Sequence, residues 1–204
     1  FRLPLLGVAV ATLVSIVALL LSAAALIGGI GGDGAHMQKA AIAVLVALVV
    51  LYAPLNTLRK GGDVPRIHDI STDLDNPPMF DKVTALRASS DNSLALDEKV
   101  QAAQKAYYTG LAALSLSGSP ADNFAAALQA AEDMGWEVVA SDKTKGHIEA
   151  TATTALFGFK DDVVIRLSGA KGGTKIDMRS ASRVGLSDLG ANAARIEAYF
   201  TKLQ

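Results

Sequence analysis

The stretch Asp162–Val184, DVVIRLSGAKGGTKIDMRSASRV, alternates apolar and polar side chains on both sides of a glycine-rich break. In an extended chain, Ile176 and Met178 share one face, and Asp177 and Arg179 share the other. Because a break of only a few residues joins antiparallel neighbours, this stretch predicts two adjacent antiparallel strands with one apolar and one polar face.

Two further strands are predicted upstream, each followed by a short turn that contains glycine or charged residues. Alternation continues in the second of them, where Glu149 and Thr151 lie opposite Ile148 and Ala150. The predicted sheet therefore has four antiparallel strands, near Trp136–Ser141, His147–Ala155, Asp162–Leu167 and Thr174–Val184.

Two amphipathic helices flank these strands. The first opens at Ser119, where Pro120 and Asp122 complete an N-terminal capping pattern, and it ends at Gly135. The second begins near Ser187 and carries an apolar stripe to the end of the chain. Together they predict a two-layer α+β domain, a four-stranded antiparallel sheet with helices on one face and the other face free for solvent or a partner.

The N-terminal part of the chain has a different composition. Leu3–Gly32 and Ala40–Leu58 contain no charged side chain, and about 20 apolar residues in a helix are enough to cross a bilayer. The sequence therefore predicts an N-terminal transmembrane helical hairpin with spans near residues 3–28 and 40–58. Small residues recur at four-residue spacing, which is typical of a packed hairpin or a docking face, although alanine is also common in both runs. They are Gly7, Ala11, Ser15, Ala43 and Ala47.

These runs predict a multi-pass protein of a bacterial inner membrane. Arg2, Arg59 and Lys60 lie at the outer ends of the hairpin and Lys39 lies between its spans, which favours a cytoplasmic domain. Large domains are translocated with little regard to flanking charge, and the chain begins at Phe1, so one further apolar segment upstream would reverse the topology. We therefore expect the domain on the periplasmic side.

The domain boundaries follow the composition. Residues 1–60 form the predicted hairpin, residues 61–118 an extended linker with a short helix near Asp97–Tyr108 that packs on the domain, and residues 119–204 the α+β core. A net charge of −1 gives no basic excess, so no nucleic-acid partner is expected. The chain has no cysteine, which excludes disulfides and thiolate chemistry.

Several segments of the chain after Val64 follow one another in a recognisable order. They are Pro65–Asp73, Glu149–Thr154, Phe157–Arg166, Asp177–Gly185 and Gly190–Ile196. In this order they resemble the DUF1499 family, a domain of unknown function. The resemblance extends to the end of the chain and implies no agreed activity, cofactor or catalytic residue.

Apparent cofactor motifs have simpler explanations. Gly29–Gly34 has the letters of a dinucleotide-binding loop, but no strand precedes it. Gly169–Lys175 lacks the residue order of a phosphate loop and is better explained as a hairpin turn. His36, His68 and His147 lack metal-ligand spacing, and no G-x-S-x-G sequence supplies a hydrolase nucleophile. We therefore expect no cofactor, metal or catalytic residue. His68, which lies beside Asp69, is the one histidine that we keep as a candidate.

Charged and amide side chains concentrate near the last strand and the last helix. In a structural interpretation, Asp188 or Asn192 caps the helix and pairs with Arg183. In a functional interpretation, the set binds a lipid headgroup or an acidic partner surface, because guanidinium groups bind phosphate and carboxylate in a planar fork. The candidate partner or anion contacts are Arg166, Arg179, Arg183, Asp188, Asn192 and Arg195.

Two classes of function remain open. The first is a noncatalytic membrane-anchored interaction domain, an accessory or stabilising subunit of a larger inner-membrane protein complex. The second is a binding domain for a lipid or another apolar small molecule. The expected partners are an integral membrane protein complex and membrane lipids, and no sequence signature indicates an enzyme. A stoichiometric partner in a native purification favours the first class, and a co-purified lipid favours the second.

Overall fold

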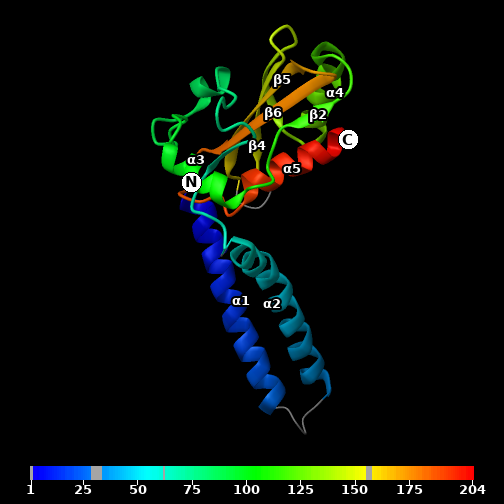
Figure 1. Cartoon of the computed structure of the whole chain (residues 1–204). Helices are drawn as coiled ribbons and strands as arrows, with labels where there is room; N and C mark the ends of the chain where they lie inside the picture. Colours follow the sequence, from blue (N-terminus) through cyan, green and yellow to red (C-terminus); the bar gives the residue numbers. More distant parts are fainter. Residues whose placement is uncertain (1, 29–33, 62, 155–157) are drawn as a thin grey trace. The chain divides into compact units, whose positions relative to one another are not determined.

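The computed structural model of this chain divides into two compact units, residues 1–62 and residues 63–204. It describes the backbone of all residues except 1, 29–33, 62 and 155–157 (Figure 1). In the first two helices, the side chains of residues 2–11, 26, 28, 34–36, 53–55 and 57–61 are also outside the description. Most of the glycine-rich motif at Gly29–Gly34, and Ala155 at the end of a predicted strand, therefore lie outside the described residues.

The first unit consists of two helices, α1 (Arg2–Gly28) and α2 (Gly34–Gly61), which contact one another. Ser15 on α1 and Ala47 on α2 are buried. Small side chains allow two helix backbones to approach closely, so burial of these two members of the predicted small-residue set is compatible with a packed pair of helices.

The prediction of a transmembrane hairpin is wrong. A crossing requires about 20 predominantly apolar residues in one helix, and none of the helices in the described part of the chain combines the length and the apolarity that a crossing needs. Helix α2 also extends beyond its uncharged run at both ends and includes Lys39, Arg59 and Lys60. This finding contradicts the predicted spans near residues 3–28 and 40–58, and it also contradicts the predicted multi-pass location in a bacterial inner membrane.

The second unit is built on one antiparallel sheet, with six strands in its described residues (Figure 1). The strand order is β1-β6-β5-β4-β3, and β2 also pairs with β6. Along β6, β1 pairs with residues 179–181 and β2 with residues 174–176, so two short strands share one edge. The strands are β1 (Asp69–Ser71), β2 (Leu114–Leu116), β3 (Glu137–Asp142), β4 (His147–Thr153), β5 (Lys160–Ala170) and β6 (Gly173–Ser182).

The predicted four-stranded sheet is therefore too small. Strands β3 to β6 lie where the four strands were predicted, whereas β1 and β2 come from the segment that was predicted to be an extended linker. Each of these two strands has only three residues, which is too short for an alternating pattern to be recognised. They form because the long strand β6 leaves unpaired backbone N–H and C=O groups along its outer edge.

The described residues of the second unit form three α-helices, α3 (Glu98–Tyr107), α4 (Pro120–Asp133) and α5 (Ala191–Leu203). The predicted capping box at the start of α4 is present, with reciprocal bonds between Ser119 and Asp122. Helices α4 and α5 pack on the apolar face of the sheet. The Tyr199 hydroxyl of α5 donates to the Ala127 carbonyl of α4 at 2.7 Å, which ties the two helices together.

The opposite face of the sheet is covered by residues 72–97, which we call the strap. The strap includes a short 3₁₀ helix, η1 (Lys82–Leu86), whose Val83 is fully buried. The prediction that this face is free for solvent or a partner is therefore wrong. The strap buries three charged side chains that the alternation had placed on this face, namely Glu149, Asp177 and Arg179, and it also buries Asp162.

The edge of β6 predicts a sensitive glycine. A Cβ atom at Gly173 would lie 2.0 Å from the backbone carbonyl oxygen of Leu116 in β2. We expect Gly173→Ala to lower the free energy of unfolding by about 2 kcal/mol, because backbone must move to relieve the overlap. Gly169→Ala is the matched control, since no atom lies within 4 Å of the place that its methyl group would occupy. Equal urea midpoints for both variants would contradict the expectation.

Candidate functional site

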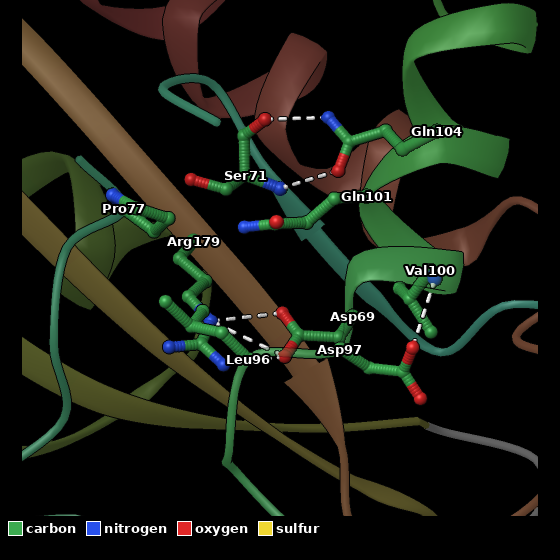
Figure 2. Close-up of a pocket in the computed structure, with 9 residues that line it drawn as sticks. All are labelled: Asp69, Ser71, Pro77, Leu96, Asp97, Val100, Gln101, Gln104 and Arg179. Atoms are coloured by element: carbon green, nitrogen blue, oxygen red, sulfur yellow. Dashed lines mark hydrogen bonds and ion pairs between the residues drawn. The ribbon is translucent and has the colours of Figure 1, made fainter. Parts of the chain in front are cut away.

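Arg179 is held in the interior of the strap-covered face. Its guanidinium group binds the Asp69 carboxylate at 2.6–3.2 Å (Figure 2). It also donates to the Leu94 carbonyl at 2.8 Å. The guanidinium carbon also lies 5.1 Å from the centre of the Phe80 ring. These contacts satisfy most of the donors of a side chain that is only 1% exposed.

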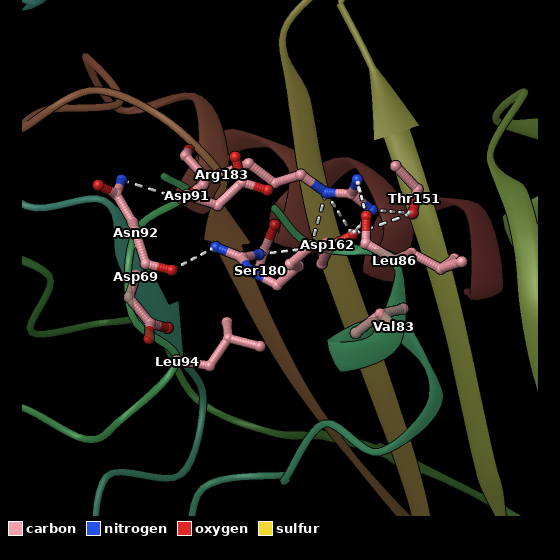
Figure 3. A network of polar contacts seen from close by, with 12 residues as sticks. Asp69, Val83, Leu86, Asp91, Asn92, Leu94, Thr151, Asp162, Ser180 and Arg183 are labelled. Atoms are coloured by element: carbon pink, nitrogen blue, oxygen red, sulfur yellow. Dashed lines mark hydrogen bonds and ion pairs between the residues drawn. The ribbon is translucent and has the colours of Figure 1, made fainter. Parts of the chain in front are cut away.

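Arg183 and Arg87 share one carboxylate. Asp162 is fully buried, and it binds Arg183 at 2.8–3.2 Å (Figure 3). It also binds Arg87. The Thr151 hydroxyl donates to the same carboxylate at 2.9 Å. Arg183 in addition donates to the Leu86 carbonyl at 3.1 Å.

Arg166 occupies the other end of this face. It binds Asp73 at 3.1 Å and Asp177 at 2.9 Å, and it donates to the Asn76 carbonyl at 3.0 Å. Lys175 binds the same two carboxylates at 3.1 Å each. The three predicted sheet arginines therefore share one pattern, in which each binds at least one carboxylate and one backbone carbonyl of the strap.

Glu149 of β4 also holds the strap, through backbone N–H groups. Its carboxylate accepts hydrogen bonds from the backbone N–H groups of Asp81 and Val83, both at 2.8 Å, and contacts the His147 ring at 2.7 Å. Burial tends to raise the pKa of this carboxyl group, but the bonds from His147 and from the backbone outweigh that tendency and leave the pKa lowered. The folded protein therefore favours the ionised form of Glu149.

This lowered pKa predicts a dependence of stability on pH. A carboxyl group whose pKa is lower in the folded state stabilises the fold above its unfolded pKa, and the contribution disappears as the pH falls through the folded pKa. We expect Glu149→Gln to cost about 2 kcal/mol at neutral pH and its difference from the native chain to shrink below about pH 4. Urea titrations at several pH values measure this, with the exposed Glu132→Gln as control. A difference that stays constant with pH would contradict it.

The other predicted polar residues lie at the opposite face of the sheet, Asn192 and Arg195 in the first turns of α5 and Asp188 just before it. Arg195 binds Asp161 and donates to the Ser180 hydroxyl at 3.0 Å. Asn192 accepts from Ser180 at 2.7 Å and donates to the His68 carbonyl at 3.0 Å. The structure therefore divides the predicted set into two groups: Arg166, Arg179 and Arg183 on one face, and Asp188, Asn192 and Arg195 at the helical face.

Asp188 orders the start of α5. The N-cap residue of α5 is Gly190, and not Asp188 or Asn192 as the structural interpretation expected, but the Asp188 carboxylate accepts from the N–H groups of Gly190 and Asn192, both at 2.9 Å. Arg183 does not pair with it but with Asp162. Burial raises the pKa of Asp188 in spite of these hydrogen bonds. Burial, with the nearby Asp188 charge as a second cause, also raises the pKa of Tyr108 to about 12.

A small pocket of about 100 Å³ opens beside Asp69, at the junction of β1, the strap and α3. A second hollow, which Arg179 lines, shares Asp69, Asp97 and Val100 with this pocket (Figure 2). The first pocket is lined by His68, Asp69, Ser93, Ala95, Asp97 and Val100. Among these lining residues, the sequence indicated a functional role only for His68. Asp97 carried the signal of a helix start, and Ser93 carried no signal.

The histidines of the second unit have separate surroundings. His147 contacts Glu149, whereas the Nδ1 atom of His68 is buried and has no hydrogen-bond partner among the described residues. In the described part of the chain, no group of three or more His, Asp or Glu side chains is arranged to hold a metal ion.

Comparison with protein families gives a match over the second unit. The family model described as "Protein of unknown function (DUF1499)" matches residues 69–203, from β1 to the last turn of α5. This match covers more than half of the chain and agrees with the resemblance in the sequence. A comparison with curated proteins gave no match.

Proposed function

We propose, from the premise that this chain belongs to the DUF1499 family, that it is a noncatalytic interaction protein which serves as an accessory subunit of a larger protein complex. The family description assigns no activity, so the proposal depends on the chain's own residues. The observation that carries it is the exposed apolar surface of the helix pair.

Both helices of the first unit expose large apolar side chains to solvent. Leu20 on α1 and Leu45 and Val49 on α2 are 63–67% exposed. Soluble monomers rarely expose apolar patches of more than a few hundred Å², and larger ones mark interaction sites. Further exposed members on the same helices are Leu13, Val14, Leu21, Ile42, Val46 and Leu48. A partner with an apolar surface would remove these side chains from water.

The contacts of the second unit fit a scaffold better than a catalyst. Its sheet arginines bind carboxylates and strap carbonyls within the same unit, so their first role is to hold the strap in place. The predicted role of Arg166, Arg179, Arg183, Asp188, Asn192 and Arg195 as contacts for a partner or an anion stays a prediction.

A second candidate is a binding protein for a lipid or another apolar small molecule. The same exposed leucine and valine side chains favour it, because apolar area is removed from water equally well by an acyl chain and by a protein surface. The two candidates differ in what remains bound to the chain after purification.

The test is isolation of the full chain from its native source in a mild nonionic detergent, followed by light scattering and mass spectrometry. We expect a partner protein at fixed stoichiometry. The double variant Leu20→Gln and Val49→Gln should lose at least about tenfold in affinity for that partner, because polar side chains would then be buried unpaired in the contact.

Leu96→Gln is the matched control, since Leu96 is an exposed apolar residue of the second unit, and it should retain the partner. A chain that carries only bound lipid supports the second candidate. A lone chain with neither protein nor lipid contradicts both.

A further inference from the structure

We propose that the pocket at the junction of β1, the strap and α3 binds a small primary amine in its ammonium form. Every residue that lines it belongs to the second unit. The inference is independent of the proposed protein partner, because the exposed apolar side chains that carry that proposal belong to the first unit.

Three residues that line the pocket have acceptor capacity left, His68 in the tautomer that carries its hydrogen on Nε2. The Nδ1 atom of His68 is buried without a hydrogen-bond partner among the described residues. Asp97 caps α3 through Oδ1, which accepts from Lys99 and Val100, and its Oδ2 accepts no bond from the described residues. Within the described part of the chain, Asp69 accepts only from Arg179, and two carboxylate oxygens provide about four acceptor sites. A primary ammonium group has three N–H donors to match them.

The charge of the lining selects a cation. Asp69 and Asp97 are two negative groups, and Arg179 neutralises the first of them, so one negative charge is left over at the pocket. A small anion would be repelled by that charge. A quaternary ammonium ion is bound by the faces of Trp, Tyr and Phe, and the pocket lining contains none of these side chains.

The size of the pocket limits the ligand. A cavity of about 150 Å³ holds benzene, so a pocket of about 100 Å³ holds an amine of about four non-hydrogen atoms. Ser93 adds selectivity, because its Oγ accepts from the Ala95 N–H at 3.1 Å and its own hydroxyl hydrogen is left to donate. An amine that also carries a hydroxyl group therefore fits better than a simple alkylamine.

The experiment is a titration of the full chain with ethanolamine, followed by the backbone amide chemical shifts of residues 93–100. We expect saturable binding with a Kd of about 1 mM, which is a realistic affinity for so small a ligand. Ethylamine should bind more weakly, and tetramethylammonium and propanol should produce no saturable shift, because the first lacks N–H donors and the second lacks the charge.

Two variants test the named acceptors. Asp97→Asn removes the charge but keeps an N-cap side chain, and it should weaken ethanolamine binding about tenfold or more. His68→Phe should weaken binding similarly. Asp75→Asn is the matched control, because Asp75 is an exposed strap carboxylate outside the pocket, and it should bind as the native chain does.

The proposal is overturned if ethanolamine gives no saturable shift in this region. It is also overturned if tetramethylammonium binds equally well, or if Asp97→Asn binds as tightly as the native chain. The Asp97 variant decides the question even if His68→Phe fails to fold, because its substitution keeps the cap of α3.

Discussion

Replacing Asp162 by alanine is expected to lower the free energy of unfolding of the second unit by about 3–5 kcal/mol. The Asp162 side chain is fully buried and binds the guanidinium groups of Arg87 and Arg183, which are only 7% and 11% exposed. Without the carboxylate, both guanidinium groups keep their charge while water has little access to them. The loss exceeds the net value of the ion pairs, because the desolvation of the arginines is no longer offset.

Urea unfolding followed by tryptophan fluorescence measures this loss. Trp136 is the single tryptophan of the chain, and it is buried against Tyr199 in the second unit, so its signal reports on that unit. Asp75→Ala, at an exposed carboxylate of the strap, should change stability by less than about 0.5 kcal/mol. A cost of less than about 1 kcal/mol for Asp162→Ala would place its ion pairs in the range of surface pairs and contradict the expectation.

The elements that sequence reasoning located correctly have local causes. Helix α4 begins directly after Ser119, because the side chains of Ser119 and Asp122 each bond the backbone N–H of the other residue. The strands β4 and β6 could be placed because alternation over seven and ten residues is a local pattern. Such signals need no knowledge of the rest of the fold.

The strap could not be predicted because its order comes from distant residues. Arg179 binds Asp69 across 110 positions of sequence, and Arg166 binds the Asn76 carbonyl across 90 positions. The alternation identified a polar face correctly, but a polar face that is open to solvent and one that is closed by buried ion pairs have the same pattern. The strap's prolines and aspartates indicated an extended segment, not the surface on which it lies.

The pocket could not be predicted from the sequence for a similar reason. Asp97 was identified only by its position before a helix, and its capping bonds use one carboxylate oxygen. Whether the second oxygen faces a pocket depends on β1 and the strap, which the sequence does not place beside α3. His68 was the one pocket residue that the sequence marked as a candidate. It was marked because it is a histidine next to an aspartate, and the sequence could not show that its Nδ1 atom has no partner among the described residues.

Arg179→Ala is the second variant with a large expected effect, a loss of about 3–5 kcal/mol in the free energy of unfolding. The substitution leaves the Asp69 carboxylate, 12% exposed, without its cation. It also removes the donor to the Leu94 carbonyl and the cation from the Phe80 ring, two contacts that hold the strap. Arg179→Lys should recover only part of the loss, because an ammonium group cannot reproduce the planar fork.

A double-mutant cycle with Asp69→Ala separates the ion pair from the other contacts. If the pair is the main cause, the double variant should lose less stability than the sum of the single variants, with a coupling of about 1–3 kcal/mol. The exposed Arg66→Ala is the matched control for loss of an arginine and should change stability little. Additive losses in the cycle would instead assign the effect of Arg179 to the strap carbonyl and the Phe80 ring, so the strap, not the carboxylate, would be what this arginine stabilises.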